Sequence, residues 1–196
     1  KNFADIVSII QLNKNSTLNV TNLELGSGKI NNNFITNLDI EHASLNIYGL
    51  VKLFENTNTT SSFTTTHNAK YCESNIKYKH SLHDNSKATF QAKTIVNKKA
   101  NFSKAFQSSN TILLSDNATI FAQPHLEILV DELEASHAAT TGSLNLDALL
   151  YLQSRGINKD QAYEMLLKAF ENEIYDNIKD SKIKEFIKNY KRSNYV

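Results

Sequence analysis

The chain has 196 residues with 21 basic and 20 acidic side chains, so its formal net charge is +1. This length suits one domain of good size or one domain with a smaller appendage, and the balanced charge gives no general electrostatic case for binding nucleic acid or a membrane surface. Cys72 is the only cysteine, which excludes an internal disulfide framework and favours a reducing compartment, so we expect the protein in the cytoplasm.

The sequence shows no sign of membrane insertion or secretion. No apolar run approaches the roughly 20 residues that a membrane helix needs, and no secretory signal pattern opens the chain. The sequence begins at Lys1, and its one methionine is Met165. We therefore expect it to be a piece of a longer protein that has a further N-terminal part.

The first part of the chain, residues 1–144, is predicted to be a β-rich core. Apolar residues alternate with polar ones in short bursts, for example Leu18 and Val20, Leu23 and Leu25, Leu38 and Ile40, Leu45 and Ile47, Phe90 and Ala92, and Leu126 and Ile128. A period of two is the strand signature. The bursts are separated by polar stretches such as GSGKINNN, whose side chains satisfy turn backbones. Many short strands and almost no helix are expected here.

A short phrase recurs in this part: a small residue, a polar one, and an apolar one that opens a strand. It occurs at 16–18, 43–45, 88–90, 100–102 and 118–120. The spacing is irregular, but small inward residues at corners suit a β-solenoid, in which each coil stacks only on its neighbours. A β-sandwich is the competing fold, and its turns are usually rich in Gly and Pro. The chain has only five Gly and one Pro, which favours the solenoid.

Beyond the strands the apolar period lengthens to three and four residues, which predicts a helical domain over residues 145–196. Asn145 or Ser143 can cap a first helix, and Gly156 supplies the left-handed conformation at its C-terminal end. Asn158 can cap a second helix.

The second predicted helix is strongly amphipathic. Its apolar positions are Ala162, Met165, Leu166, Ala169, Phe170, Ile174 and Ile178. A shorter third helix is expected from about Ser181. Three such helices cannot bury all their apolar faces by themselves, so they dock on the β-domain of the same chain or on a partner protein; the pattern leaves both alternatives open.

Common catalytic motifs are missing from the sequence. It has no Gly-rich phosphate loop, Gly-x-Ser-x-Gly elbow, His-Glu-x-x-His or Cys-x-x-Cys. His67 and Cys72 could form half of a metal site, but two ligands do not make one, and a lone cysteine is more often a buried small side chain. His80 and His83 are predicted to be surface residues.

His137 is the best candidate for chemistry. It follows the acidic residues Asp131, Glu132 and Glu134 and precedes a run of small side chains at 138–142 that leaves the imidazole uncrowded. A nearby carboxylate would raise the pKa of the histidine and orient its ring. A neutral imidazole is a good ligand for iron or zinc, and histidine can replace cysteine in holding an iron–sulfur cluster. Without further information, a lone histidine at a domain junction is more often structural or exposed.

Three segments carry a resemblance to a known family. They read KHSLHDNSKATFQAKTIV, FQSSNTILLSDNATIFAQPHLEIL and ASHAATTGSLNLDALLYLQSRGI. In this order they resemble the C-terminal half of the SufB/SufD scaffold proteins of the SUF iron–sulfur cluster assembly system. The resemblance runs from about His67 to Phe170, and the region before His67 is similar only in its strand-rich style.

The junction around His137 is similar to the SufD branch. The segment Ser136-His137-Ala138-Ala139-Thr140, with Gly142 two positions further on, stands where the SufB branch carries a Glu-His-Glu-Ala-Thr-Thr-Ser type of sequence. SufD proteins often have a cysteine two residues before this histidine and a glycine after it, whereas this chain has Ala135 and Ala138. Any role of that cysteine is therefore absent here.

The resemblance implies a right-handed parallel β-helix over residues 1–144 and a small helical domain over residues 145–196. It also implies a non-catalytic scaffold that pairs with a SufB-like subunit through the β-helix and binds a SufC-like ATPase through the helices. A transient iron–sulfur cluster would form at the pairing interface with His137 as a ligand, and none would be bound stably by this chain alone. The implied ATPase contacts are Ala162, Met165, Leu166, Ala169 and Phe170.

Two other functions remain as alternatives. A carbohydrate-active β-helix protein would need paired carboxylates in a groove, and the only dense acidic cluster is Asp131–Glu134. A purely structural solenoid would have no chemical role for His137. The resemblance to a family that works as a complex also implies that a lone subunit can form a homodimer through the same edge of the β-helix that is meant for its partner.

Overall fold

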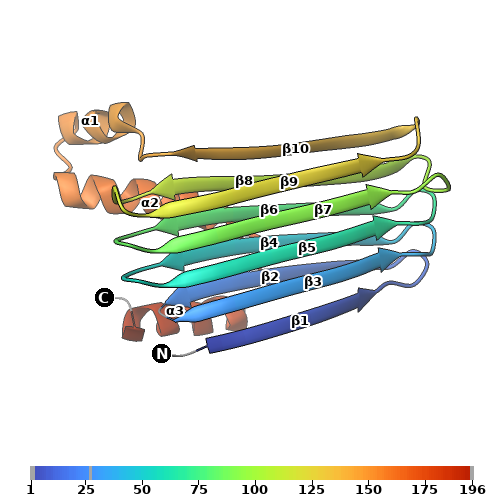
Figure 1. Ribbon diagram of the computed structural model, residues 1–196. Coiled ribbons are helices and arrows are strands. Elements are labelled where there is room, and N and C mark those ends of the chain that lie inside the picture. Colours follow the sequence, from blue (N-terminus) through green and yellow to red (C-terminus); the bar gives the residue numbers. More distant parts are fainter. Residues whose placement is uncertain (1–2, 27, 195–196) are drawn as a thin grey trace. The chain divides into compact units, whose positions relative to one another are not determined.

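The computed structural model describes residues 3–26 and 28–194 (Figure 1). The chain divides into two compact units, Lys1–Leu144 and Asn145–Val196. The described strands of the first unit are β1 (Phe3–Gln11), β2 (Thr17–Gly26), β3 (Lys29–Leu38), β4 (Ser44–Leu53), β5 (Asn58–His67), β6 (Glu73–Leu82), β7 (Lys87–Val96), β8 (Ser103–Leu113), β9 (Thr119–Ile128) and β10 (Leu133–Gly142).

Successive strands alternate between two sheets. One sheet has the order β1-β3-β5-β7-β9 and the other β10-β8-β6-β4-β2, and every neighbouring pair is parallel. Figure 1 shows the odd-numbered strands stacked in front of the even-numbered ones. This topology is a parallel β-solenoid of about five turns. The predicted fold class is confirmed, and the antiparallel sandwich is excluded.

The length of each coil explains why the repeat looked irregular in the sequence. Asn68 donates to Asp39, and Asn97 donates to Asn68, at separations of 29 residues in both cases. By contrast, Phe3 pairs with Lys29, 26 positions later. Lengths change at the turns while the strands stay near ten residues, so the repeat is regular in space but not along the sequence.

The corners of the solenoid need few glycines because other residues adopt the left-handed conformation. His42, Tyr71 and Phe102 have φ angles of 60°, 58° and 62°. Their rings form a stack, with centroids 4.9 Å apart between the first two and 5.2 Å apart between the last two. This stacking offsets part of the cost of positive φ for residues with a side chain.

The interior of the first unit is lined by aromatic, aliphatic and small side chains. The Phe34 and Phe63 rings stack 5.1 Å apart, and Tyr78 and Phe90 pack beside Phe63. Of the small residues in the recurring phrase, those at 43, 88, 100 and 118 are buried and that at 16 is half-buried. They are small because two sheets converge at the corners and leave little volume there.

The second unit consists of α1 (Leu146–Ser154), α2 (Lys159–Tyr175) and α3 (Ser181–Asn194). Asn145 caps α1 by accepting from the amide of Ala148, and Asn158 caps α2 by accepting from that of Gln161. Gly156 follows α1 with φ of 86°, a conformation that strongly favours glycine. Within the described residues, no helix is long and apolar enough to cross a membrane.

Candidate functional site

His137 lies in the middle of β10, which is the terminal strand of its sheet, and β9 is the terminal strand of the other sheet. We call the end of the solenoid formed by β9 and β10 the open end. One edge of β10 pairs with β8. A terminal strand presents backbone N–H and C=O groups along its other edge, which a further strand can pair with.

The register of β10 decides which way His137 points. His137 pairs with Gln107 of β8, Ala135 with Ala105, and Ala139 with Ser109. Paired residues of parallel strands carry their side chains on the same face of a sheet. The three β8 residues face the interior and are buried, so His137 belongs to the inner face. It is nevertheless exposed, because β10 is the terminal strand of its sheet and pairs with β8 along one edge only among the described strands.

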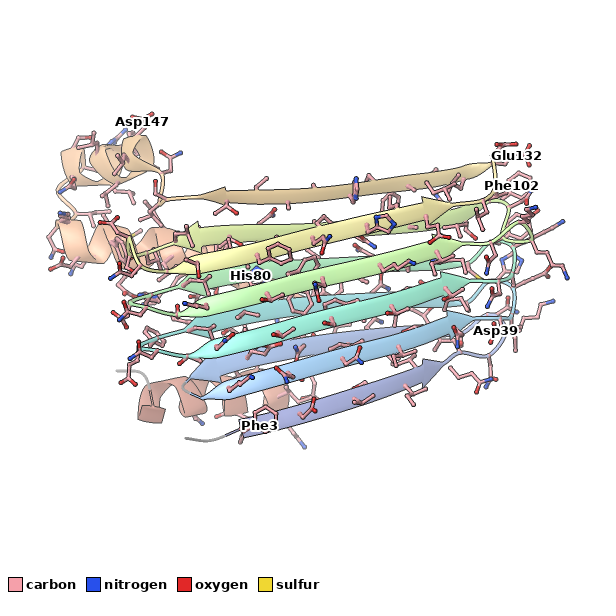
Figure 2. The ribbon with its side chains drawn as sticks, in the orientation of Figure 1. Phe3, Asp39, His80, Phe102, Glu132 and Asp147 are labelled. Carbon is pink, nitrogen blue, oxygen red and sulfur yellow. The ribbon has the colours of Figure 1, made fainter. Side chains whose placement is uncertain are left out.

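The acidic residues near His137 in sequence have other contacts. Glu134 lies on the outer face of β10 and forms an ion pair with Lys104 at 3.2 Å. The backbone oxygen of Glu132, just before β10, accepts from the amide of Phe102, just before β8, and the two residues lie close together at the same corner of the solenoid (Figure 2). The expectation that a neighbouring carboxylate orients the imidazole is therefore not met by Glu134, since the strand alternation turns the two side chains to opposite faces.

His67 and Cys72 are both fully buried. His67 Nε2 lies 2.7 Å from Ser74 Oγ, and the Cys72 thiol lies 3.3 Å from the carbonyl oxygen of Ile40. Burial lowers the pKa of His67 to about 4 and raises the pKa of the Cys72 thiol, so neither favours its charged form near neutral pH. Among the described residues no group of three or more His, Cys, Asp or Glu could hold a metal ion.

The surface prediction for His80 and His83 was wrong. His80 is buried in the interior, with Nδ1 3.5 Å from Ser109 Oγ and 3.4 Å from Thr111 Oγ1. His83 is half-buried and stacks on Phe54 with centroids 4.5 Å apart. The strand alternation of β6 places His80 on the same inner face as Tyr78 and Ile76.

The candidate ATPase contacts on α2 fall into three classes of exposure. Ala162 is buried, Leu166 and Phe170 are half-buried, and Met165 and Ala169 are exposed. A shallow pocket beside Met165 is lined by Ile157, Asp160, Gln161, Glu164 and Lys168. The exposed part of the apolar face is thus narrower than the periodicity suggested.

Two buried polar residues were missed by the sequence reasoning. Gln107 is 3% exposed, and it is the residue of β8 that pairs with His137 of β10. Glu24 is 2% exposed, and its carboxylate accepts from Asn32 Nδ2 at 2.6 Å and Ser61 Oγ at 2.8 Å, and also from Asn22 and Thr59. The alternation of inward and outward side chains along β8 could have predicted that Gln107 faces the interior. That prediction requires the length of each coil, which the sequence alone did not fix.

Fold and site together define a class: a parallel β-solenoid, with a separate helical unit, that presents an exposed imidazole on an edge strand. Residues 6–170 match the family model described as SUF system FeS cluster assembly, SufBD core domain. The chain therefore belongs to the SufBD family of the SUF system. The match includes the region before His67, so the family likeness extends further toward the N-terminus than the sequence motifs indicated.

Individual relatives agree with the family match. The chain is similar to the iron–sulfur cluster assembly protein SufD of Escherichia coli, with 29% identity over 82% of this chain and 38% of the relative. A SufBD family protein of Synechocystis is 38% identical over 46% of this chain and 20% of its own length. The chloroplastic protein ABCI7 of Arabidopsis thaliana is 31% identical over 55% of this chain and 23% of its own length. The chain spans less than half the length of each of these relatives.

Proposed function

We propose that the chain is the core of a non-catalytic scaffold subunit for iron–sulfur cluster assembly. It pairs with a SufB-like subunit through the open end of its solenoid and carries a SufC-like ATPase on its helical unit. The observation that carries the proposal is the exposed His137 on the inner face of the terminal strand, in a chain that matches the SufBD core. Because Cys72 is the only cysteine, we expect a reducing compartment such as the cytoplasm.

The open end is suited to receiving another solenoid. The terminal strands β9 and β10 can each accept a further strand by backbone hydrogen bonding. Inward residues of β9, namely Ile120, Ala122, Pro124 and Leu126, are only half-buried, so a docking partner would remove additional apolar surface from water. In the absence of a SufB-like subunit, a second copy of this chain offers the same surface, which supports a homodimer.

His137 can act as one ligand to a cluster in transit. Its neighbours Ala135 and Ala139 on the inner face of β10 are small, and a neutral imidazole binds iron through one ring nitrogen. A cluster needs several ligands, and the described residues offer no group of three or more near one another. The remaining ligands must come from the partner, so the cluster is cargo of the complex and is not held stably by this chain alone.

The helical unit is the proposed ATPase-binding element. Met165 and Ala169 are its exposed anchors on α2, and Leu166 and Phe170 contribute their half-buried sides. Ala162 is buried and would act only by supporting the helix. A few apolar anchors can supply most of the affinity of such an interface.

A carbohydrate-active role is less well supported. It requires two carboxylates that flank a bound sugar chain in a groove. Glu134 is engaged in an ion pair with Lys104, and Asn101 Nδ2 lies 3.4 Å from Glu132 Oε2 at the preceding turn. A structural solenoid with no chemical role remains the alternative that the following experiment tests.

The experiment replaces His137 in the full-length protein and measures iron–sulfur enzyme activity in a host that lacks its own copy. We expect His137→Ala to lower that activity by at least about ten-fold, as the loss of metal-site residues commonly does. His125→Ala is the matched control, because His125 is also exposed and lies on the adjacent terminal strand β9. Wild-type iron–sulfur enzyme activity in both variants would favour the structural solenoid. Anaerobic purification should recover the SufB-like and SufC-like partners with the wild-type protein, and failure to recover both would contradict the scaffold assignment.

A further inference from the structure

Gln107 has a buried side chain that is anchored at only one end. Its Nε2 donates to Thr94 Oγ1 at 2.6 Å and to the backbone oxygen of His125 at 3.3 Å. Its Oε1 is also buried but has no hydrogen-bond partner. A buried acceptor without a donor is unfavourable, and such groups are uncommon in native proteins.

The orientation of the Gln107 amide is fixed by its surroundings. The backbone oxygen of His125 can only accept a hydrogen bond, so the amide nitrogen, and not the amide oxygen, must face it. Thr94 and His125 lie on β7 and β9, the strands of the opposite sheet. With its nitrogen held by that sheet, the amide leaves its Oε1 directed away from both anchors.

The missing donor can come from the next coil. Strands in a sheet are about 4.8 Å apart, and paired residues of parallel strands share a face. The residue that pairs with Gln107 on β10 is His137, and the inward residues on either side of it are Ala135 and Ala139, which have no polar side-chain atoms. An imidazole N–H is therefore the side-chain donor that β10 places nearest to Gln107 Oε1.

We propose that Gln107 is a positioning residue for His137. Gln107 Oε1 accepts a hydrogen bond from one N–H of the imidazole after rotation of the His137 side chain, which is exposed. This bond selects one tautomer and leaves the lone pair of the other ring nitrogen facing away from the solenoid, where iron would bind. Partners of this kind commonly set the tautomer and direction of metal-binding histidines. The purpose of this positioning rests on the proposed function, whereas the test of the hydrogen bond does not require it.

The test measures the tautomer of His137 in the purified full chain, without iron or partner. Long-range ¹H–¹⁵N correlation, recorded at a pH above which the imidazole signals no longer change, reports which ring nitrogen of the neutral ring carries the proton. We expect a single tautomer in the wild type. Gln107→Leu removes the acceptor and should return His137 to the tautomer mixture of an unconstrained imidazole.

Controls separate positioning from a general disturbance of β8. Ser109→Ala removes a different buried polar group from the inner face of the same strand, the hydroxyl of the residue that pairs with Ala139, and should leave the His137 tautomer unchanged. Thr94→Val removes one of the two acceptors of Gln107 Nε2 but keeps Gln107 Oε1. It should give a partial mixture of His137 tautomers, and it serves as the test if Gln107→Leu does not fold. A tautomer mixture in the wild type, as expected if water satisfies Oε1, or unchanged spectra in both Gln107→Leu and Thr94→Val, would overturn the proposal.

A cellular readout links the positioning to cluster assembly. In the full-length protein, Gln107→Leu should lower iron–sulfur enzyme activity by about ten-fold, the usual lower range for loss of a group that orients a metal ligand. Ser109→Ala should not lower it. A changed tautomer with normal enzyme activity would uphold the positioning of His137 and count against its role as a ligand, so the two proposals can fail separately.

Discussion

At the scale of single residues, the interior of the solenoid contains two histidines that are uncharged at neutral pH. Burial lowers the pKa of His67 and that of His80 to about 4. Each ring lies close to hydroxyl groups, Ser74 for His67 and Ser109 and Thr111 for His80. These contacts stabilise the neutral imidazole in place without supplying a negative charge that would favour the protonated form.

The two buried histidines predict a stability loss on acidification. Below about pH 6.5 the two histidines become protonated in the unfolded chain, whereas in the folded chain they stay neutral until about pH 4. The free energy of unfolding should therefore fall as the pH drops from about 6.5 to 4, by about 3 kcal/mol for each histidine. Urea denaturation at several pH values measures this decrease.

A variant series tests the source of that loss. His67→Asn and His80→Asn should each flatten the pH dependence between pH 6.5 and 4, although they also change stability at neutral pH through packing. His125→Asn removes an exposed histidine and should leave the slope as in the wild type. An unchanged slope in the double variant of His67 and His80 would show that other groups cause the acid sensitivity.

At the scale of elements, β2 shows how a strand can keep its period while its apolar side changes face. Its alternation begins with Leu18 and Val20 toward the interior and continues inward with Asn22 and Glu24. Leu23 and the other apolar residue of the burst, Leu25, then lie on the outer face. The Glu24 carboxylate is tolerated inside because hydrogen-bond donors surround it. Its charge adds to burial in raising the pKa of Tyr78.

The pairing of β4 with β6 predicts the effect of one added methyl group. Gly49 pairs with Tyr78, and a Cβ at Gly49 would lie 2.2 Å from Cζ of the Tyr78 ring. That ring is fully buried beside Phe63 and Phe90, so the added Cβ would force the ring or its neighbours to shift. Gly49→Ala should lower the free energy of unfolding by about 1–3 kcal/mol, the usual cost of overpacking a core.

Gly142→Ala is the matched control for this prediction. Nothing lies within 4 Å of the position that its Cβ would occupy, so the substitution should leave the midpoint of urea unfolding nearly unchanged. Equal midpoints for the two alanine variants would mean that the Tyr78 ring shifts at little cost and that the interior is less tightly packed than the structure indicates.

At the scale of the whole molecule, the proposed function depends on the open end being a docking surface. Ala139 lies on the inner face of β10, one inward position beyond His137, and is exposed. Ala139→Glu would bury a charge against the docked partner, and an unpaired buried charge is costly. We expect at least a ten-fold weaker affinity for the SufB-like subunit, or for a second copy of the chain.

The control places the same charge one coil away from the open end. Gln91 is exposed on the outer face of β7, where it pairs with Gln123 of β9, so Gln91→Glu adds one negative charge to the outer face of the solenoid and none to the inner face of β10. Sedimentation of the purified chain measures self-association, and quantitative anaerobic co-purification measures the partner. Equal association of the two variants would place the interface elsewhere on the solenoid.

Much of this organisation could be predicted from residues near one another in the sequence. Strand alternation, the Asn145 and Asn158 caps and Gly156 depend on interactions within a few residues, and they indicated strands followed by helices. The family followed from ordered motifs and is confirmed by the match over residues 6–170. His137 was selected by its neighbours in sequence, and its role as a ligand remains a proposal.

The sequence by itself therefore determined strands followed by a helical segment, the family and the candidate histidine, because local backbone preferences and short motifs encode them. The solenoid was favoured by the strand pattern and implied by the family resemblance. Only the tertiary structure decided that His80 is buried, that Glu134 turns away from His137, and that Gln107 lies beneath it. These facts depend on contacts between coils about 30 residues apart. A shift of one residue in coil length would reverse every inward and outward position, and no local pattern fixes that length.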